Sequence, residues 1–65
     1  MSRQALLNEM YLETLYNVKA NMKAKDKVKL KENLILLRKI IQFSTRPTKR
    51  MTDLERGLTQ VVKIR

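Results

Sequence analysis

The 65-residue chain contains no cysteine, no histidine and no tryptophan, and only one glycine and one proline. Disulfides are excluded, and a zinc or haem site would lack its usual ligands. The commonest nucleophile–base pairs and proton shuttles are missing for the same reason. We therefore expect a non-enzymatic protein that uses no metal, no cofactor and no small-molecule substrate.

Long apolar runs are also missing, because the longest covers residues 34–37, whereas a membrane-spanning helix needs about 18 such residues. The first residues lack the apolar stretch followed by small residues that marks a secretory signal. The sequence therefore predicts no membrane association and a cytoplasmic location. A hydrophobic content of 43% with little glycine and proline argues against a disordered chain.

Positive charge, in contrast, is abundant and unevenly placed. The net charge is +9, and residues 1–18 sum to −1, residues 19–31 to +5, residues 32–45 to +1 and residues 46–65 to +4. Two basic segments are thus separated by a nearly neutral one. This pattern indicates a polyanion or an acidic protein as the partner.

Apolar residues in the first third of the chain recur at helical spacing, and Ser2 is a suitable N-cap. We expect a helix over residues 2–22. Leu12 and Tyr16 fall well outside its apolar stripe, so one neighbouring helix cannot cover both sides. The stripe itself consists of Leu7, Tyr11, Leu15, Val18 and Met22.

The stripe ends where lysines replace apolar residues, which predicts a turn over residues 23–27 with Asp26 as the next N-cap. A second helix over residues 27–43 follows. No glycine or proline marks the break, so one bent helix is the alternative. On the second helix, Lys27, Lys31 and Arg38 fall opposite the apolar stripe of Leu30, Leu34, Leu37 and Ile41.

Pro47 predicts a loop over residues 44–51, because it lacks a backbone donor and disfavours helix in the residue before it. Thr52 and Glu55 have the spacing of a capping box, which predicts a short third helix over residues 52–63. Gly57 costs about 1 kcal/mol within a helix. Residues 61–64 have the composition of a short strand as an alternative.

The expected fold is all-α: a hairpin of two longer amphipathic helices and a short third helix in a single small domain. Such a chain buries only roughly 60% of its unfolded surface, and the hairpin alone cannot cover both apolar arcs. We expect homodimerisation into a four-helix-bundle-like core, with a three-helix monomer as the alternative. The candidate dimer interface is Leu7, Tyr11, Leu12, Leu15, Tyr16, Leu30, Leu34, Leu37 and Ile41.

The candidate nucleic-acid interface combines the two basic segments. The lysines of the first alternate, so they would form one row in an extended segment but spread around the axis of a helix. The second basic segment, with Arg46, Lys49 and Arg50 around Pro47, resembles an arginine-bearing arm that enters a narrow minor groove, which favours DNA over RNA. The candidate residues are Lys23, Lys25, Lys27, Lys29, Lys31, Arg46, Lys49 and Arg50.

These patterns predict a small nucleic-acid-binding accessory or regulatory factor, for example in transcription regulation. The alternative is an inhibitor or adaptor that docks on an acidic protein of the transcription or replication machinery. A ribonucleoprotein component is a third possibility. A helix-turn-helix is disfavoured because the connection to the third helix is too long. Glu9 and Glu13 share a solvated helix face, where catalysis or metal binding is not expected.

Overall fold

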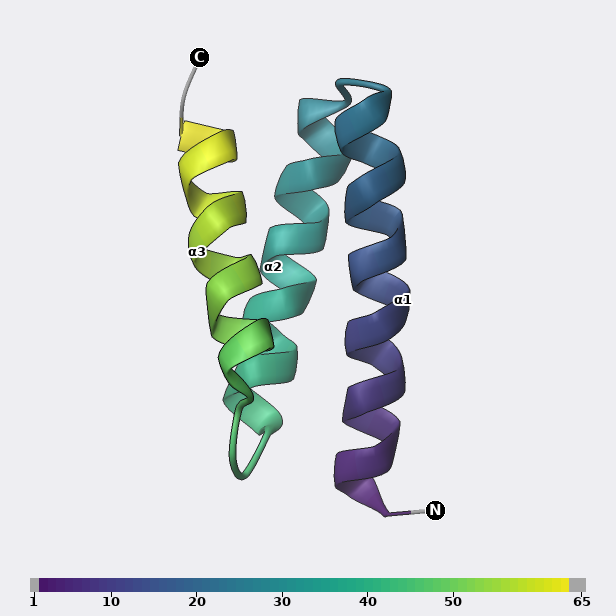
Figure 1. Cartoon of the computed structure of the whole chain (residues 1–65), viewed down its shortest axis with the longest axis vertical. Coiled ribbons are helices and arrows are strands. Elements are labelled where there is room, and N and C mark those ends of the chain that lie inside the picture. Colours follow the sequence, from purple (N-terminus) through teal and green to yellow (C-terminus); the bar gives the residue numbers. More distant parts are fainter. Residues whose placement is uncertain (1, 64–65) are drawn as a thin grey trace.

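The computed structural model describes residues 2–63, and in this part of the chain three helices and no strand are present. They are α1 (Arg3–Lys23), α2 (Lys27–Phe43) and α3 (Lys49–Lys63). α1 and α3 both pack on α2 and run antiparallel to it (Figure 1). The bundle measures 37 × 17 × 15 Å. The all-α prediction is confirmed.

α1 begins and ends with local hydrogen bonds. The Oγ of Ser2 accepts from the amide of Ala5 at 3.1 Å, which confirms the predicted N-cap. At the other end Lys25 adopts φ 55°. Its amide donates to the carbonyl of Met22, and the amide of Asp26 donates to that of Asn21. This is a Schellman ending, with lysine at the left-handed position where glycine is usual. It makes a sharp turn without glycine or proline, so α1 and α2 are separate helices.

α2 is bounded by side chains that satisfy its ends. Asp26 Oδ1 accepts from the amide of Lys29 at 3.2 Å, so this predicted N-cap is also confirmed. At the C-terminus, the Ser44 hydroxyl donates to the carbonyl of Ile40 at 2.7 Å. Ser44 then takes an extended conformation and the chain leaves the helix.

The start of α3 differs from the prediction. The helix begins at Lys49 instead of Thr52, because Thr48 supplies the cap: its Oγ1 accepts from the amide of Met51 at 3.2 Å. The predicted capping box is therefore wrong. Thr52 lies inside the helix, and its hydroxyl donates to the carbonyl of Lys49 at 3.0 Å. The run at 61–63 is helical, so the strand alternative does not apply there, and residue 64 lies outside the described residues.

The core is centred on α2, which lies between the other two helices. Leu37 is fully buried and Ile40 nearly so. Leu15, Ile41, Leu54, Val61 and Val62 pack around this core while partly buried. The buried apolar side chains are Leu7, Tyr11, Val18, Leu30, Leu34, Leu37, Ile40, Met51 and Leu58.

The buried polar side chains carry their own partners. The hydroxyl of Thr14, which is 1% exposed in the inner face of α1, donates to the carbonyl of Met10 at 2.8 Å. Among residues 2–63, no buried side-chain nitrogen or oxygen lacks a hydrogen-bond partner. The packing is therefore free of the penalty that an unsatisfied buried polar group would impose.

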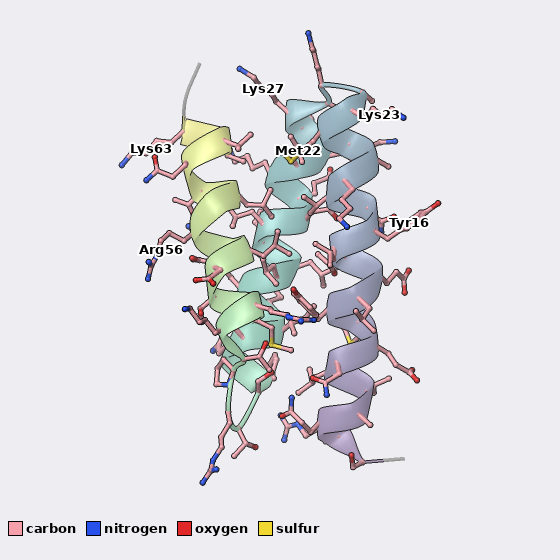
Figure 2. All side chains as sticks on the ribbon, viewed as in Figure 1. Tyr16, Met22, Lys23, Lys27, Arg56 and Lys63 are labelled. Carbon is pink, nitrogen blue, oxygen red and sulfur yellow. The ribbon has the colours of Figure 1, made fainter. Side chains whose placement is uncertain are left out.

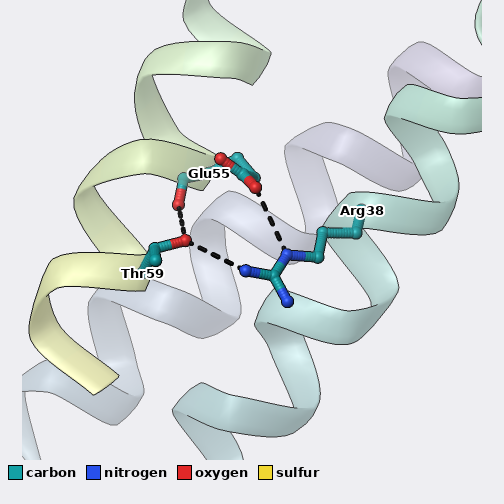
Figure 3. Close-up of polar contacts among 3 residues, drawn as sticks. All are labelled: Arg38, Glu55 and Thr59. Carbon is teal, nitrogen blue, oxygen red and sulfur yellow. Dashed lines mark hydrogen bonds and ion pairs between the residues drawn. The ribbon is translucent and has the colours of Figure 1, made fainter. Parts of the chain in front are cut away.

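Arg38 joins α2 to α3, as Figure 3 shows. Its Nε lies 3.2 Å from Glu55 Oε1, and its Nη2 donates to Thr59 Oγ1 at 3.4 Å. The prediction that Arg38 lies opposite the packed face is wrong, because this side chain reaches round the edge of α2 to α3. The Arg38 side chain is 53% exposed and that of Glu55 30%, so water screens the pair and it contributes about 1 kcal/mol at most.

Most of the expected dimer interface lies inside the single chain. Leu7, Tyr11, Leu30, Leu34 and Leu37 are buried in its core, and Leu15 and Ile41 are partly buried. The third helix, together with α1, covers the apolar stripe of α2, so a second copy is not needed there. From that set, Leu12 and Tyr16 stay exposed.

A large apolar surface nevertheless remains outside the core. The exposed apolar side chains are Leu6, Met10, Leu12, Tyr16, Met22, Val28, Ile35, Leu36 and Phe43. No helix in the described part combines the length and the apolar character that a bilayer span requires.

Candidate nucleic-acid interface

The first basic segment forms one end of the bundle, where α1 turns into α2. α3 finishes at the same end, and it adds Lys63 to the five lysines of the candidate set. Figure 2 shows Lys23, Lys27 and Lys63, from three different helices, at this end. We call this group the lysine end: Lys23, Lys25, Lys27, Lys29, Lys31 and Lys63, all exposed.

The lysines do not form a single row, because residues 27–31 are helical. Lys29 lies in a polar cleft between α1 and α2 with Asn17 and Asn21. Lys31 lies on the side of α2 that faces α3, in a cleft with Thr59. The single row of lysines that an extended segment would give is therefore wrong. The lysines instead spread around the helix axis, which was the other arrangement considered from the sequence. The ammonium groups surround the end of the bundle.

The second basic segment lies at the opposite end, where α2 connects to α3 (Figure 1). Arg46 is in the connection, and Lys49 and Arg50 form the first turn of α3. α1 begins at this end too, and the guanidinium of Arg3 lies 5.6 Å from the centre of the Phe43 ring. We call Arg3, Arg46, Lys49 and Arg50 the arginine end.

Two residues of this end, Lys49 and Arg50, border a cleft of about 410 Å³ between α1 and α3. Its walls are Asn8, Tyr11 and Leu12 from α1 and residues 48–51 from the start of α3. Because the helix begins earlier than expected, Lys49 and Arg50 are helical, and of the three basic residues of the expected arm only Arg46 lies in the connection between α2 and α3. A helix that began at Thr52 would have offered free amides there to a phosphate, but the amide of Thr52 donates to the carbonyl of Thr48 and is not available for this.

A row of cations along α3 links the two ends. Lys49, Arg56 and Lys63 follow one another at intervals of seven residues, which places them on one helix face, and all three are exposed. The exposed carboxylate of Asp53 lies on the same face, between Lys49 and Arg56. Arg56 points away from the other two helices (Figure 2). The candidate set lacked Arg56 and Lys63. Their seven-residue spacing was visible in the sequence, and the earlier start of the helix adds Lys49 to the same face.

The outer face of α1 has the opposite charge in its first half. Glu9 and Glu13 are exposed there, one helical turn apart, between Arg3 at the start of the helix and Lys19 and Lys23 towards its end. The two outer helices therefore differ: the exposed face of α3 carries three cations and the carboxylate of Asp53, whereas α1 carries two acidic groups in its first half.

The α2–α3 pair does not have the geometry of a helix-turn-helix. Its two helices lie side by side and antiparallel (Figure 1), whereas that motif sets its helices at about 90–120°. Comparison of the chain with protein-family models, curated proteins and solved structures gives no match.

Proposed function

We propose that this chain is a small, non-enzymatic nucleic-acid-binding protein that acts in the cytoplasm as a dimeric accessory or regulatory factor. It binds the phosphate backbone through its lysine and arginine ends. The observation that carries the proposal is the row Lys49, Arg56 and Lys63, which joins the two ends along the exposed face of α3.

The dimensions of the bundle favour duplex DNA. Its long axis of 37 Å is comparable with one helical turn of DNA, about 34–36 Å. Cations at both ends of the bundle therefore suit phosphates about one turn apart. Lysine is a point charge that carries little base information, so the interface supplies affinity more than sequence specificity.

A salt titration of binding to a short generic DNA duplex tests the proposal. If some five phosphates are contacted, log affinity should fall with log salt at a slope of about −4 to −5, because bound counterions are released. Replacing Lys23, Lys25, Lys29 and Lys31 together with glutamine should make the slope shallower by several units. Arg56→Gln should reduce it by about 1.

Lys39→Gln is the matched control, because Lys39 is an exposed lysine of α2 outside both ends. It should leave the slope nearly unchanged. Fluorescence anisotropy with labelled duplex measures all of these variants. Absence of binding at low ionic strength, or equal effects of Lys39→Gln and Arg56→Gln, would contradict the proposal.

A second candidate function is favoured by the cleft between α1 and α3. Tyr11, Leu12 and Met51 give it an apolar lining, and Lys49 and Arg50 border it. This combination suits an amphipathic helix with acidic residues from another protein. The chain would then be an inhibitor or adaptor of an acidic protein.

Pull-down with and without nuclease distinguishes the two functions. A protein partner that survives nuclease treatment, and is lost on Arg50→Glu but kept on Lys39→Glu, supports the adaptor. Partners that all disappear with nuclease support direct nucleic-acid binding.

A further inference from the structure

The outer face of α1 carries a regular seam that the fold leaves exposed except at Ala5, which is half-buried. Its residues follow one another at alternating steps of four and three, the spacing by which helices pair along a common seam. Tyr16 is 75% exposed and Leu12 61% exposed, although both are large apolar side chains. Figure 2 shows Tyr16 pointing away from α2 and α3. The seam consists of Ala5, Glu9, Leu12, Tyr16, Lys19 and Lys23.

This seam is complementary to itself when two copies run antiparallel. With a two-fold axis level with Thr14, Leu12 faces Tyr16 of the second copy and Glu9 faces its Lys19. Ala5 then faces Lys23, where a small residue leaves room for a long one. In a two-fold interface every such contact occurs twice. A parallel arrangement would instead set Glu9 against Glu9 and Lys19 against Lys19.

We propose that two copies of this chain associate through antiparallel α1 helices, with Leu12 and Tyr16 in the centre and Glu9–Lys19 ion pairs on both sides. Complementary charge argues for a second copy, since acidic and basic residues occupy opposite ends of one helix face. Exposed apolar groups at the centre supply the burial. This inference gives the contact surface for the dimer of the proposed function and rests on that part of it.

The seam predicts a weak dimer. Two large apolar side chains from each copy form its centre, and polar residues in a seam fix register at a cost in stability. The arrangement also leaves α3 free, because Arg56 points to the opposite side of the bundle from Tyr16 (Figure 2). A dimer would therefore present two basic α3 faces on its two outer sides and could bridge two nucleic-acid segments.

Charge reversal tests the interface and its direction. Glu9→Lys sets lysine against lysine at both pairs, and Lys19→Glu sets glutamate against glutamate. Each should weaken the dimer by about tenfold at low salt. The double variant Glu9→Lys with Lys19→Glu restores opposite charges in the antiparallel arrangement, so it should recover the dimer. Sedimentation equilibrium over a range of protein concentrations measures the dissociation constant.

Asp53→Lys and Lys39→Glu are matched controls, because they make the same charge changes at exposed positions outside the seam. Both should dimerise like the unmodified chain. Tyr16→Ser should weaken the dimer without lowering helix content in circular dichroism.

A chain that stays monomeric at millimolar concentration would overturn the inference, as would single and double variants that dimerise equally well. If the chain is monomeric but still binds duplex DNA with the expected salt slope, only the dimer is overturned, and the nucleic-acid function stands. Loss of duplex binding with the dimer intact would overturn the nucleic-acid function alone.

Discussion

The inner and outer faces of α1 carry similar apolar side chains, but those of the inner face are buried and those of the outer face are exposed. Tyr11 on the inner face is 8% exposed, whereas Tyr16 on the outer face is 75% exposed. Leu7 and Leu12 form a second pair of this kind, buried and exposed respectively. The difference lies in what is opposite each face: α2 covers one, and nothing in the described part of the chain covers the other.

This comparison shows that the apolar content of the chain exceeds what one copy buries. The inner positions hold the fold together, and the outer ones remain exposed. Substitutions inside the bundle should therefore change the free energy of unfolding strongly. Those outside should change it little unless they alter the backbone itself.

The largest expected effect is at the centre of the core. Leu37→Ala removes a side chain with no exposed surface, and such substitutions cost about 2–5 kcal/mol. A domain of this size has only about 3–5 kcal/mol of stability, so the variant should be largely unfolded. Urea unfolding followed by circular dichroism at low protein concentration measures this. Leu12→Ala, from the outer face, should change stability by about 0.5 kcal/mol or less. Equal effects would mean that the inner–outer distinction is wrong.

A substitution at Gly57 in α3 is expected to increase the free energy of unfolding. A Cβ atom added there meets nothing within 4 Å, and its φ is not positive. Gly57→Ala should therefore stabilise the chain by about 1 kcal/mol through helix propensity. This corresponds to a rise in melting temperature of about 4–8 °C. A fall in melting temperature would show that another part of the molecule needs this position to be small.

A smaller increase in the free energy of unfolding is expected at Lys25. Its φ of 55° is a left-handed conformation, which is strained for a residue with a Cβ atom. Lys25→Gly removes a penalty of about 1–2 kcal/mol, offset by the roughly 0.5–1 kcal/mol that glycine adds in unfolded-state freedom. The net stabilisation should be about 0.5–1 kcal/mol in urea unfolding. Lys23→Gly, in the last turn of α1, is the control and should destabilise. Destabilisation by both would contradict the left-handed ending.

The smallest effect is expected at the rim between α2 and α3. Arg38→Ala removes the contacts with Glu55 and Thr59, but its side chain is 53% exposed and water screens the ion pair. The loss should be about 0.5 kcal/mol and should shrink at high salt. A double-mutant cycle with Glu55→Ala isolates the pair. A coupling energy between Arg38 and Glu55 well above about 1 kcal/mol would contradict the view that this ion pair is screened by water.

Much of the fold was predictable because its signals are local. The caps at Ser2 and Asp26 depend on side chains beside the amides that they bind, and the second helix has its predicted bounds. The start of α3 was missed because Thr48 and Thr52 are both competent caps. Thr48 follows Pro47 directly, and capping there gives the helix its additional first turn.

The candidate site was less predictable. The sequence located both basic segments, but their placement at opposite ends of the bundle depends on how three helices pack. The row of Lys49, Arg56 and Lys63 depends on the same packing, because it leaves that face of α3 outward. Arg38 was misplaced because a long side chain can reach round the edge of its helix to a neighbour.

By itself, the sequence determined that the chain is helical, where its first two helices lie and which face of each is apolar, since periodicity and caps act over a few residues. Only the tertiary structure decided what covers each face. An apolar stripe looks the same whether its partner is a helix of the same chain or of another copy. The position of α3 against α2 therefore turned most of the expected dimer interface into a core and left Leu12 and Tyr16 outside it.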